Sequence, residues 1–517
     1  MSQSSGEIVS ELRERGFSPT NGARTRLTEI DEWRAVLNKL EQNADSNFIS
    51  TDDVDDAAEL VKHQEETADE LDSTQQAAEL GGEYETYQLS ERTPLTEVTD
   101  LDRPAIEQRD SPPAVTVEKD INGNSTATAR DVEEFIEHER DRVQRCLDLF
   151  DGHVSSIQNV KKQAPQDADV AVAGRVVRTG RTRSDNPKII IEDFSGGELL
   201  TFFNDDSLSD LVDSVMVGDV VLIQGTVFRT DDGFTMVSGH TPAHEEKTGL
   251  NLPDIPRNNS RTRSSVEGKV ALISDIHFGS QEFEPHKWNQ FVDHVRETPA
   301  IRYVVVAGDM VEGINVYPGQ EEELSIQRLD DQYEAAGRAF SDFPDDVEIV
   351  ISTGNHDAVR LEEPQPPLRD EHQEHFPDNC TFVGNPVQFT IGGTRFLVYH
   401  GVSLHSIEEG IPAASIADPT TCMSPMLEKR QLAPNYNDAP RLSPEEQSYH
   451  VIEDVPDVFH TGHVHKFGLD TYRDSFVTNT GTWQGQTDFQ KSKNISPDVG
   501  YVSVYDLQSK SMNVLHF

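Results

Sequence analysis

Unbroken apolar runs that end abruptly in polar residues characterise the C-terminal half of the chain. The five runs are "KVALISDIHFG" (269–279), "RYVVVAGDM" (302–310), "VEIVISTGNHD" (347–357), "TRFLVYHG" (394–401) and "DVFHTGHVH" (457–465). Strands that are buried on both faces have such near-continuous apolar sequences, which is typical of layered α/β sheets. Helical stretches such as "EPHKWNQFVDHVRE" would cover those faces. The pattern predicts an α/β domain over residues 262–517.

A different pattern fills residues 166–250. Short β-type runs, such as "KIIIEDFSG" and "ELLTFFND", alternate there with Gly and Asp turns. Several short strands at this spacing predict a small barrel, with a small sandwich as the alternative. The phrase "VMVGDVVLIQGTVF" resembles the central strands of an OB-fold, so we expect an OB-fold β-barrel in this segment.

The N-terminal part of the chain combines helical and aperiodic segments. Apolar positions at spacings of three and four predict a small helical module over residues 1–70 and a helical connector over residues 128–165. Residues 71–127 are rich in Pro, Asp, Glu, Ser and Thr without a sustained period, which predicts a flexible acidic linker. The whole pattern therefore predicts a multidomain protein.

The charge of the chain is strongly negative. Its 517 residues include 93 acidic and 44 basic side chains, which gives a formal charge of −49. Such a composition is found both in disordered chains and in folded proteins with carboxylate-rich surfaces. The apolar runs favour folded domains joined by an acidic linker. Because concentrated salt screens self-repulsion, the composition suits a cytosol of very high salt, and we expect an extreme halophile as the source.

Three further features bound the cellular context. Cys146, Cys380 and Cys422 are too few and too scattered for a disulfide framework or a cysteine-based zinc site. No apolar run approaches the roughly 20 residues that a membrane span needs. The N-terminus lacks the basic-then-apolar layout of a signal peptide. We therefore expect a soluble, cytoplasmic protein without a membrane partner.

Each of the five apolar runs ends in side chains that can bind metal. The candidates are Asp275, His277, Asp309, Asn355, His400, His463 and His465. Because ligands in layered α/β sheets gather outside the carboxyl ends of strands, these endings can converge on one crevice. Carboxylates, imidazoles and an amide oxygen suit a borderline ion such as Mn²⁺, Zn²⁺ or Fe²⁺. Seven candidates exceed one tetrahedral site, so two ions about 3.5–4 Å apart, bridged by a carboxylate, account for them better.

Taken singly, these residues have ordinary structural explanations. Asp275 or Asp309 could cap a helix or a turn, and Asn355 could close a turn. Only the five endings together favour a metal centre. His460 does not fit the pattern and is expected to be an ordinary strand residue, whereas His405 is a candidate for a supporting contact.

The order Asp-x-His, Gly-Asp, Gly-Asn-His-Asp, His-Gly, Gly-His-x-His resembles the calcineurin-like metallophosphoesterase superfamily. The resemblance implies that one metal is held by Asp275, His277 and His465, the other by Asn355, His400 and His463, with Asp309 bridging. It also implies a catalytic role for His356, which would face the scissile phosphate and donate a hydrogen bond or a proton. Asp357 would support catalysis by orienting His356 or its loop.

Longer phrases resemble a narrower family. "LISDIHFGSQEFEPHKWNQF", "VAGDMVEGINVYPGQEEEL" and "NTGTWQGQTDFQ" are similar to the small subunit of archaeal family D DNA polymerase, and this resemblance covers nearly all of residues 262–517. It implies a 3′→5′ exonuclease that acts on DNA 3′ ends and proofreads for a separate large polymerising subunit. It also implies two divalent cations, with Mn²⁺ preferred over Zn²⁺, Fe²⁺ or Mg²⁺. The alternatives are a stand-alone phosphodiesterase or repair nuclease, and a mainly structural subunit that contacts replisome factors.

The barrel is expected to dock the large subunit, with a direct grip on DNA as the alternative. Single-strand-binding barrels combine stacking aromatics with a basic groove. The candidate residues here are Arg175, Arg178, Arg181, Arg183 and Lys188, with Phe202 and Phe203 nearby.

Tyr317 and Pro318 could stack a terminal base or only pack their loop. Arg430 and Arg441 could contact phosphate or a partner, with surface ion pairing as the plainer explanation.

Overall fold

The computed structural model describes most of the chain after residue 113. The described residues are 112, 114–121, 132–150, 152, 154–182, 185–203, 208–230, 235–239, 249–256, 266–317, 319–434, 440–492 and 495–517, together with three short strands nearer the N-terminus. The chain divides into two compact units, residues 1–82 and residues 83–517. In the first unit, β1 (Ser18–Pro19) pairs in parallel with β2 (Phe48–Ile49). The helical module predicted over residues 1–70 otherwise lies outside the described residues.

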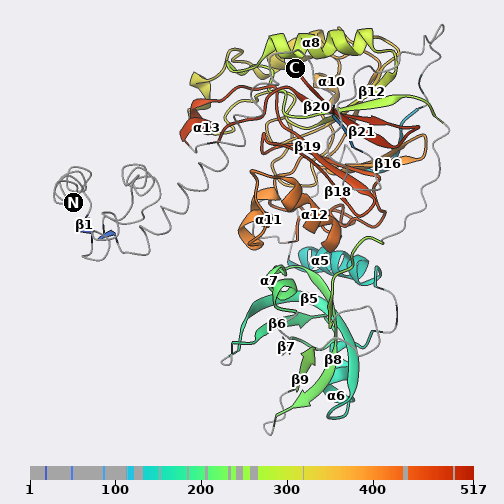
Figure 1. Cartoon of the computed structure of the whole chain (residues 1–517), viewed down its shortest axis with the longest axis vertical. Helices are drawn as coiled ribbons and strands as arrows, with labels where there is room; N and C mark the ends of the chain where they lie inside the picture. Colours follow the sequence, from blue (N-terminus) through green and yellow to red (C-terminus); the bar gives the residue numbers. More distant parts are fainter. Residues whose placement is uncertain are drawn as a thin grey trace, which may run out of the picture. The chain divides into compact units, whose positions relative to one another are not determined.

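Two mixed β-sheets form the centre of the C-terminal domain (Figure 1). The first sheet has the order β14 (Cys380–Val383), β13 (Glu348–Ser352), β12 (Ile301–Ala307), β11 (Lys269–Ile273), β20 (Tyr501–Asp506), β21 (Ser511–His516), β3 (Glu85–Tyr87). The second has the order β18 (Phe467–Tyr472), β19 (Ser475–Thr480), β17 (Val458–Thr461), β16 (Thr394–Val398), β15 (Val387–Ile391), β4 (Thr116–Lys119). Strands β11 to β14 are parallel, as are β16, β17 and β19.

Side-chain alternation along the strands builds four layers. In β11, Val270 and Leu272 face the second sheet, whereas Ala271 and Ile273 face the helices on the outer side. The outer face of the first sheet is covered by α8 (Pro285–Glu297) and α9 (Leu329–Phe340). The second sheet is covered by α11 (Leu404–Gly410) and α12 (Thr420–Lys429), which lie on the other side of the sandwich from α8 in Figure 1. Burial on both faces explains the unbroken apolar runs, and it confirms the predicted layered domain.

Five strands close into a small barrel. They are β5 (Asp169–Arg181), β6 (Pro187–Glu192), β7 (Leu199–Phe203), β8 (Val220–Arg229) and β9 (Thr235–Gly239). Their order is β8-β5-β6-β7-β9, and pairing between β8 and β9 closes the ring, with β10 (Leu250–Asn251) added beside β8. The helices α6 (Ile157–Lys162) and α7 (Ser209–Asp213) belong to this domain, and alternate strand residues fill its apolar core. The predicted small barrel is therefore confirmed.

A buried ion pair and buried hydrogen bonds join the barrel to the β-sandwich; we call this contact the junction. Lys429, the last residue of α12, donates to Ser214 O at 2.8 Å and to the Asp219 carboxylate. In α5 (Val132–Leu147), the Arg142 guanidinium bonds Glu139 at 2.9 Å, and it also bonds Gln431. All of these groups are removed from water, so the junction is a fixed structural contact.

Strand β4 corrects part of the linker prediction. Residues 116–119 pair with β15, Lys119 reaches Glu453 at 3.3 Å, and Asp120 accepts from Gly384 N at 2.9 Å. The predicted flexible linker over residues 71–127 is therefore wrong for residues 114–121, and also for β3, which pairs with β21. The strand escaped the sequence pattern because Thr116, Val117 and Glu118 are exposed at a sheet edge, where main-chain pairing replaces apolar alternation.

Short helices complete the described elements: η3 (Gln320–Glu322), α10 (Asp370–Gln373) and α13 (Asp488–Ser492). Among the described helices, none has both the length and the apolar character required to cross a bilayer.

Candidate metal centre

The predicted ligands follow the carboxyl ends of five strands at one edge of the sandwich. Asp275, Asp309, His400 and His463 each lie two residues after β11, β12, β16 and β17, and Asn355 lies three residues after β13. His277 and His465 stand two positions further along their loops. Because these strands run in parallel within each sheet, their ends deliver the side chains to one place.

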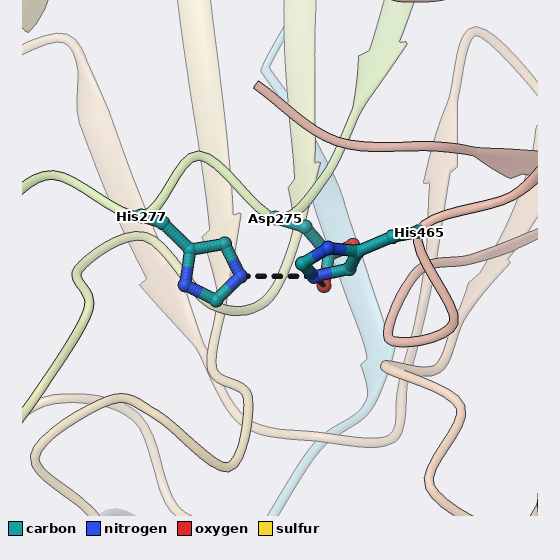
Figure 2. Close-up of side chains that lie close together, drawn as sticks. All are labelled: Asp275, His277 and His465. Atoms are coloured by element: carbon teal, nitrogen blue, oxygen red, sulfur yellow. Dashed lines mark hydrogen bonds and ion pairs between the residues drawn. The ribbon is translucent and has the colours of Figure 1, made fainter. Parts of the chain in front are cut away.

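The first group of ligand atoms comes from Asp275, His277 and His465, which lie within 4.8 Å of one another (Figure 2). His277 Nε2 lies 3.0 Å from His465 Nε2, and His465 Nε2 lies 3.4 Å from Asp275 Oδ1. Two imidazole nitrogens that face each other beside a carboxylate suit a shared cation.

The second group is formed by Asp309, His400 and His463, with the Asn355 amide beside it. His400 Nε2 lies 3.2 Å from Asp309 Oδ2 and 3.0 Å from Asn355 Oδ1. Asp309 Oδ2 is also 3.9 Å from His277 Nε2 in the first group. Asp309 is thus the carboxylate that lies between the two groups, as a bridging ligand must.

Two ligand histidines are oriented through their other ring nitrogen. His400 Nδ1 bonds Ala307 O at 2.9 Å, and His277 Nδ1 lies 2.9 Å from Glu312 Oε2. An Nδ1–H directed at such an acceptor leaves Nε2 unprotonated and available to a metal. Both Nε2 atoms face the cluster, so the tautomers fit cation binding.

Glu312 is a functional residue that the sequence analysis missed. It is 1% exposed, and its carboxylate accepts from Gln484 Nε2 at 2.7 Å, Gln320 Nε2 at 2.9 Å and Tyr317 OH at 3.1 Å. Its position three residues after Asp309, in "GDMVEG", was the one available signal. Because several donors fix it, Glu312 holds the His277 ring in place.

The electrostatics of the site favour a cation. Burial alone would raise the pKa of Asp309, but His400, His356 and His277 outweigh burial and hold this pKa well below its usual range. Burial lowers the pKa of His400, yet Asp309 raises it to about 10 overall. Burial, followed by the neighbouring His400, lowers the pKa of His463. The carboxylates attract positive charge, and the lowered pKa keeps His463 neutral.

The backbone at the ligands is unusual. Five of the seven have positive φ angles: Asp275 (52°), His277 (58°), Asp309 (51°), His463 (72°) and His465 (55°). Asp, Asn and His tolerate this left-handed region better than other side chains, but each such residue still costs on the order of 1–3 kcal/mol. Strain concentrated in the ligand loops is typical of a functional site. The burial, donor types and convergence of these residues fit a pair of divalent cations.

His356 lies beyond the ligand groups. Its backbone N–H donates to Asp309 Oδ1 at 2.8 Å, and its Nδ1 bonds Glu312 O at 2.7 Å. Burial lowers the pKa of His356, but Asp309 and Glu312 raise it by more, so the net shift is upward. These contacts turn Nε2 toward the cavity, with Asp309 Oδ2 4.0 Å away.

Asp357 lies beneath the loop instead of facing the cavity. Its carboxylate accepts from Gly354 N at 2.9 Å, from Met310 N at 3.4 Å and from Tyr333 OH at 3.4 Å. Burial, and next the charge of Asp309, raise its pKa to about 7. These contacts agree with the supporting role expected for Asp357, in which it positions the loop that carries His356.

A cavity of about 170 Å³ opens beside both ligand groups. Its lining residues are His277, Asp309, Glu312, Tyr317, His356, His405, Ile416, His463, Val464, His465, Gln484, Thr487, Gln490 and Ile495. His405 thus reaches the cavity, with its ring centroid 5.4 Å from that of His463. His460 is a buried residue of β17 that bonds Thr480 at 3.1 Å, in agreement with its expected structural role.

The basic residues predicted to contact DNA differ in how exposed they are and in whether they pair with acidic side chains. Arg175 is paired with Glu139 at 2.9 Å and with Glu192, so its guanidinium already has acidic partners. Arg181 pairs with Asp213 at 3.2 Å, whereas Arg178 is exposed and Lys188 half-buried. Phe203 is buried in the barrel core and Phe202 is half-buried. Arg183 and Pro318 lie outside the described residues.

Arg430 also differs from its prediction. It is 4% exposed, follows α12 in a left-handed conformation (φ 55°), and donates to the backbone carbonyls of Ile452 and Glu453. It therefore satisfies buried carbonyls and has no access to phosphate. Arg441 is exposed.

Comparisons of the sequence with known proteins agree with the candidate metal centre. A family model described as calcineurin-like phosphoesterase matches residues 268–467. A DNA polymerase II small subunit of Halobacterium salinarum is 34% identical over 99% of this chain and 98% of its own length. The proteins of the same name from Archaeoglobus fulgidus and Methanothermobacter thermautotrophicus are 34% and 31% identical, over 76% and 99% of this chain and 78% and 99% of theirs.

Proposed function

The chain belongs to the DNA polymerase II small subunits, and from this membership and its metal centre we propose that it hydrolyses DNA from the 3′ end. The proposed activity is a two-metal 3′→5′ exonuclease that proofreads within a heteromeric replicative polymerase. The observation that carries the proposal is the convergence of two buried ligand groups on the single carboxylate of Asp309.

Seven side chains would hold the two cations. The first cation would be held by Asp275, His277 and His465, and the second by Asn355, His400 and His463, with Asp309 shared. We expect Mn²⁺, with Zn²⁺, Fe²⁺ or Mg²⁺ as alternatives. When bound, the cations neutralise the phosphodiester and lower the pKa of the attacking water.

His356 would act on the substrate itself. The bond between its Nδ1 and Glu312 O fixes the ring, so that Nε2–H can donate to the leaving oxygen or to a non-bridging oxygen of the phosphate. Glu312 and Asp357 are positioning residues: the first orients His277, and the second supports the loop of His356.

The barrel is proposed to be an OB-fold that docks the large polymerising subunit. Its strand order, with β7 and β9 parallel and α7 inserted between β7 and β8, supports that fold. The acidic partners of Arg175 and Arg181 reduce the basic surface left for DNA, which favours docking.

Co-expression of the full chain with the large subunit of the same polymerase should give one complex in size-exclusion chromatography at high salt. Separate elution of the two chains would contradict this part of the proposal.

The exonuclease is tested on a primer with a mismatched 3′ end. With the full chain and Mn²⁺, we expect His356→Ala to reduce nucleotide release by about 10²–10⁴-fold, because general acid–base groups contribute on this order. His286→Ala, an exposed histidine on α8, is the matched control and should retain the wild-type rate. A His356→Ala rate within a few-fold of wild type would refute the role of this histidine.

A further inference from the structure

Three aliphatic side chains line the cavity beside the metal centre. Ile416 comes from the loop between α11 and α12, Val464 stands between His463 and His465, and Ile495 follows α13. The described lining residues include no Lys or Arg. Apart from the groups assigned to the metals and to His356, this part of the cavity offers mainly apolar surface to a ligand.

Two polar side chains near these aliphatic residues, Gln484 and Gln490, already have partners. Gln484 Nε2 donates to Glu312 and to Ser280 Oγ at 2.9 Å. Gln490 bonds His465 Nδ1 through Nε2 at 2.8 Å and accepts from Thr487 N at 3.1 Å. Reading a base requires donors and acceptors that face its edge. Amides held in this way are not presented for that purpose.

Tyr317 adds a fixed aromatic ring to the same cavity. Its hydroxyl lies between two carboxylates, Glu312 Oε1 at 3.1 Å and Glu323 Oε2 at 2.9 Å. Its ring centroid is 6.3 Å from that of His356, at an interplanar angle of 59°. An aromatic side chain anchored through its polar end can contact the flat face of any base.

We infer that Ile416, Val464, Ile495 and Tyr317 receive the nucleoside of the 3′-terminal nucleotide without distinguishing its base. This inference rests on the proposed exonuclease function. The cavity volume of about 170 Å³ lies below the ~300–1,000 Å³ of pockets that enclose drug-sized ligands, so this cavity suits one small group at the end of a strand and not a longer segment. A proofreading site must accept all four bases, and a pocket that uses apolar burial meets that requirement.

The test compares two DNA strands that differ only in the terminal nucleotide. One strand ends in a normal nucleotide and the other in a tetrahydrofuran abasic nucleotide, and release is measured with the full chain and Mn²⁺. We expect wild type to prefer the normal terminus by about tenfold in kcat/KM, with the four bases within about threefold of one another. Ile416→Trp should reduce the tenfold preference to below about twofold, and Ile416→Ala to about threefold. Leu361→Trp is the control and should keep the tenfold preference, because Leu361 is an exposed residue of the same size as isoleucine and does not line the cavity.

The preference ratio separates this inference from general loss of activity. A defect in folding lowers both rates equally and leaves the ratio unchanged, so an Ile416 variant that keeps a tenfold ratio overturns the inference. Equal cleavage of the normal and abasic termini by wild type, or a spread above tenfold among the four bases, also overturns it. Wild type that cleaves neither strand refutes the exonuclease itself, and the nucleoside pocket is refuted with it.

Discussion

The junction and the metal centre are both buried clusters of charged residues, but their charges are balanced in different ways. At the junction, each buried cation has an acidic partner: Lys429 meets Asp219, and Arg142 meets Glu139. At the metal centre, the Asp309 carboxylate lies among several imidazoles, and no Lys or Arg of the described residues pairs with it. Buried charges that are paired within the protein hold domains together. Buried carboxylates left without such a partner require a cation from outside.

The largest effect is expected when the shared carboxylate loses its charge. Asp309→Asn should reduce Mn²⁺-dependent nucleotide release by about 10³-fold or more, because bridging two cations contributes several kcal/mol to the transition state. Mn²⁺ should also stop raising the unfolding temperature, since ligand binding stabilises only a protein that binds it. The exposed Asp345→Asn serves as control. Retention of more than a tenth of the wild-type rate would show that Asp309 is not shared.

Breaking the pair at the junction should instead affect stability. Lys429→Met leaves the Asp219 carboxylate buried without its cation, and we expect a loss of about 3–5 kcal/mol in the free energy of unfolding. Chemical denaturation at constant high salt measures this value. Lys491→Met, which removes an exposed pair with Asp488, should leave stability essentially unchanged. Adding Asp219→Asn to Lys429→Met should recover part of the loss; no recovery would rule out the uncompensated carboxylate as the cause.

An intermediate effect is expected at Glu312, which orients a ligand without belonging to the ligand set. Glu312→Gln places an amide where donors from Gln320, Tyr317 and Gln484 converge, and the His277 ring loses its anchor. Metal affinity should fall by about 10–100-fold, which is usual for such supporting residues. Activity titrated against Mn²⁺ should shift to higher concentration and recover near saturation. Failure to recover at saturating metal would assign Glu312 a direct catalytic role.

The smallest effect concerns Asp120, a partly buried carboxylate that forms no ion pair in the described part of the chain. Burial raises its pKa from 3.8 to about 6, although hydrogen bonds such as that from Gly384 N oppose the shift. Because the folded-state pKa is raised, Asp120 imposes no penalty below about pH 4, and stability falls as pH rises through 6. Asp120→Asn should therefore be about 1–3 kcal/mol more stable than wild type at pH 7.5 and equal to it at pH 4. Equal stability at both values would contradict the raised pKa.

The sequence predicted the metal centre better than the junction, for physical reasons. A ligand that follows a buried strand is marked by an abrupt change from apolar to polar residues, and parallel strands bring such endings together, as with Asp275 and Asp309. Pairs such as Lys429 and Asp219 are 210 residues apart and carry no local periodicity. Arg175 and Arg430 likewise looked like surface residues because their acceptors lie in other elements.

The secondary-structure elements likewise divide into those that the sequence predicted and those that it did not. The five strands that carry ligands and the closed barrel followed from apolar runs and turn residues. Strand β4 and the contribution of Glu312 did not, because an edge strand needs no alternation and a single carboxylate in a loop, five residues after β12, has no pattern of its own. Strand β4 and the contacts of Glu312 both depend on segments that are distant in the sequence.

The left-handed backbone at Asp275, His277, Asp309, His463 and His465 limits how this centre can be altered. Asparagine accepts that conformation, whereas a β-branched residue strongly resists it. Asparagine is therefore the substitution that removes these candidate ligands with the least disturbance of the backbone. Valine or isoleucine at the same positions would damage the scaffold as well as the chemistry, and a loss of activity could not then be attributed to either.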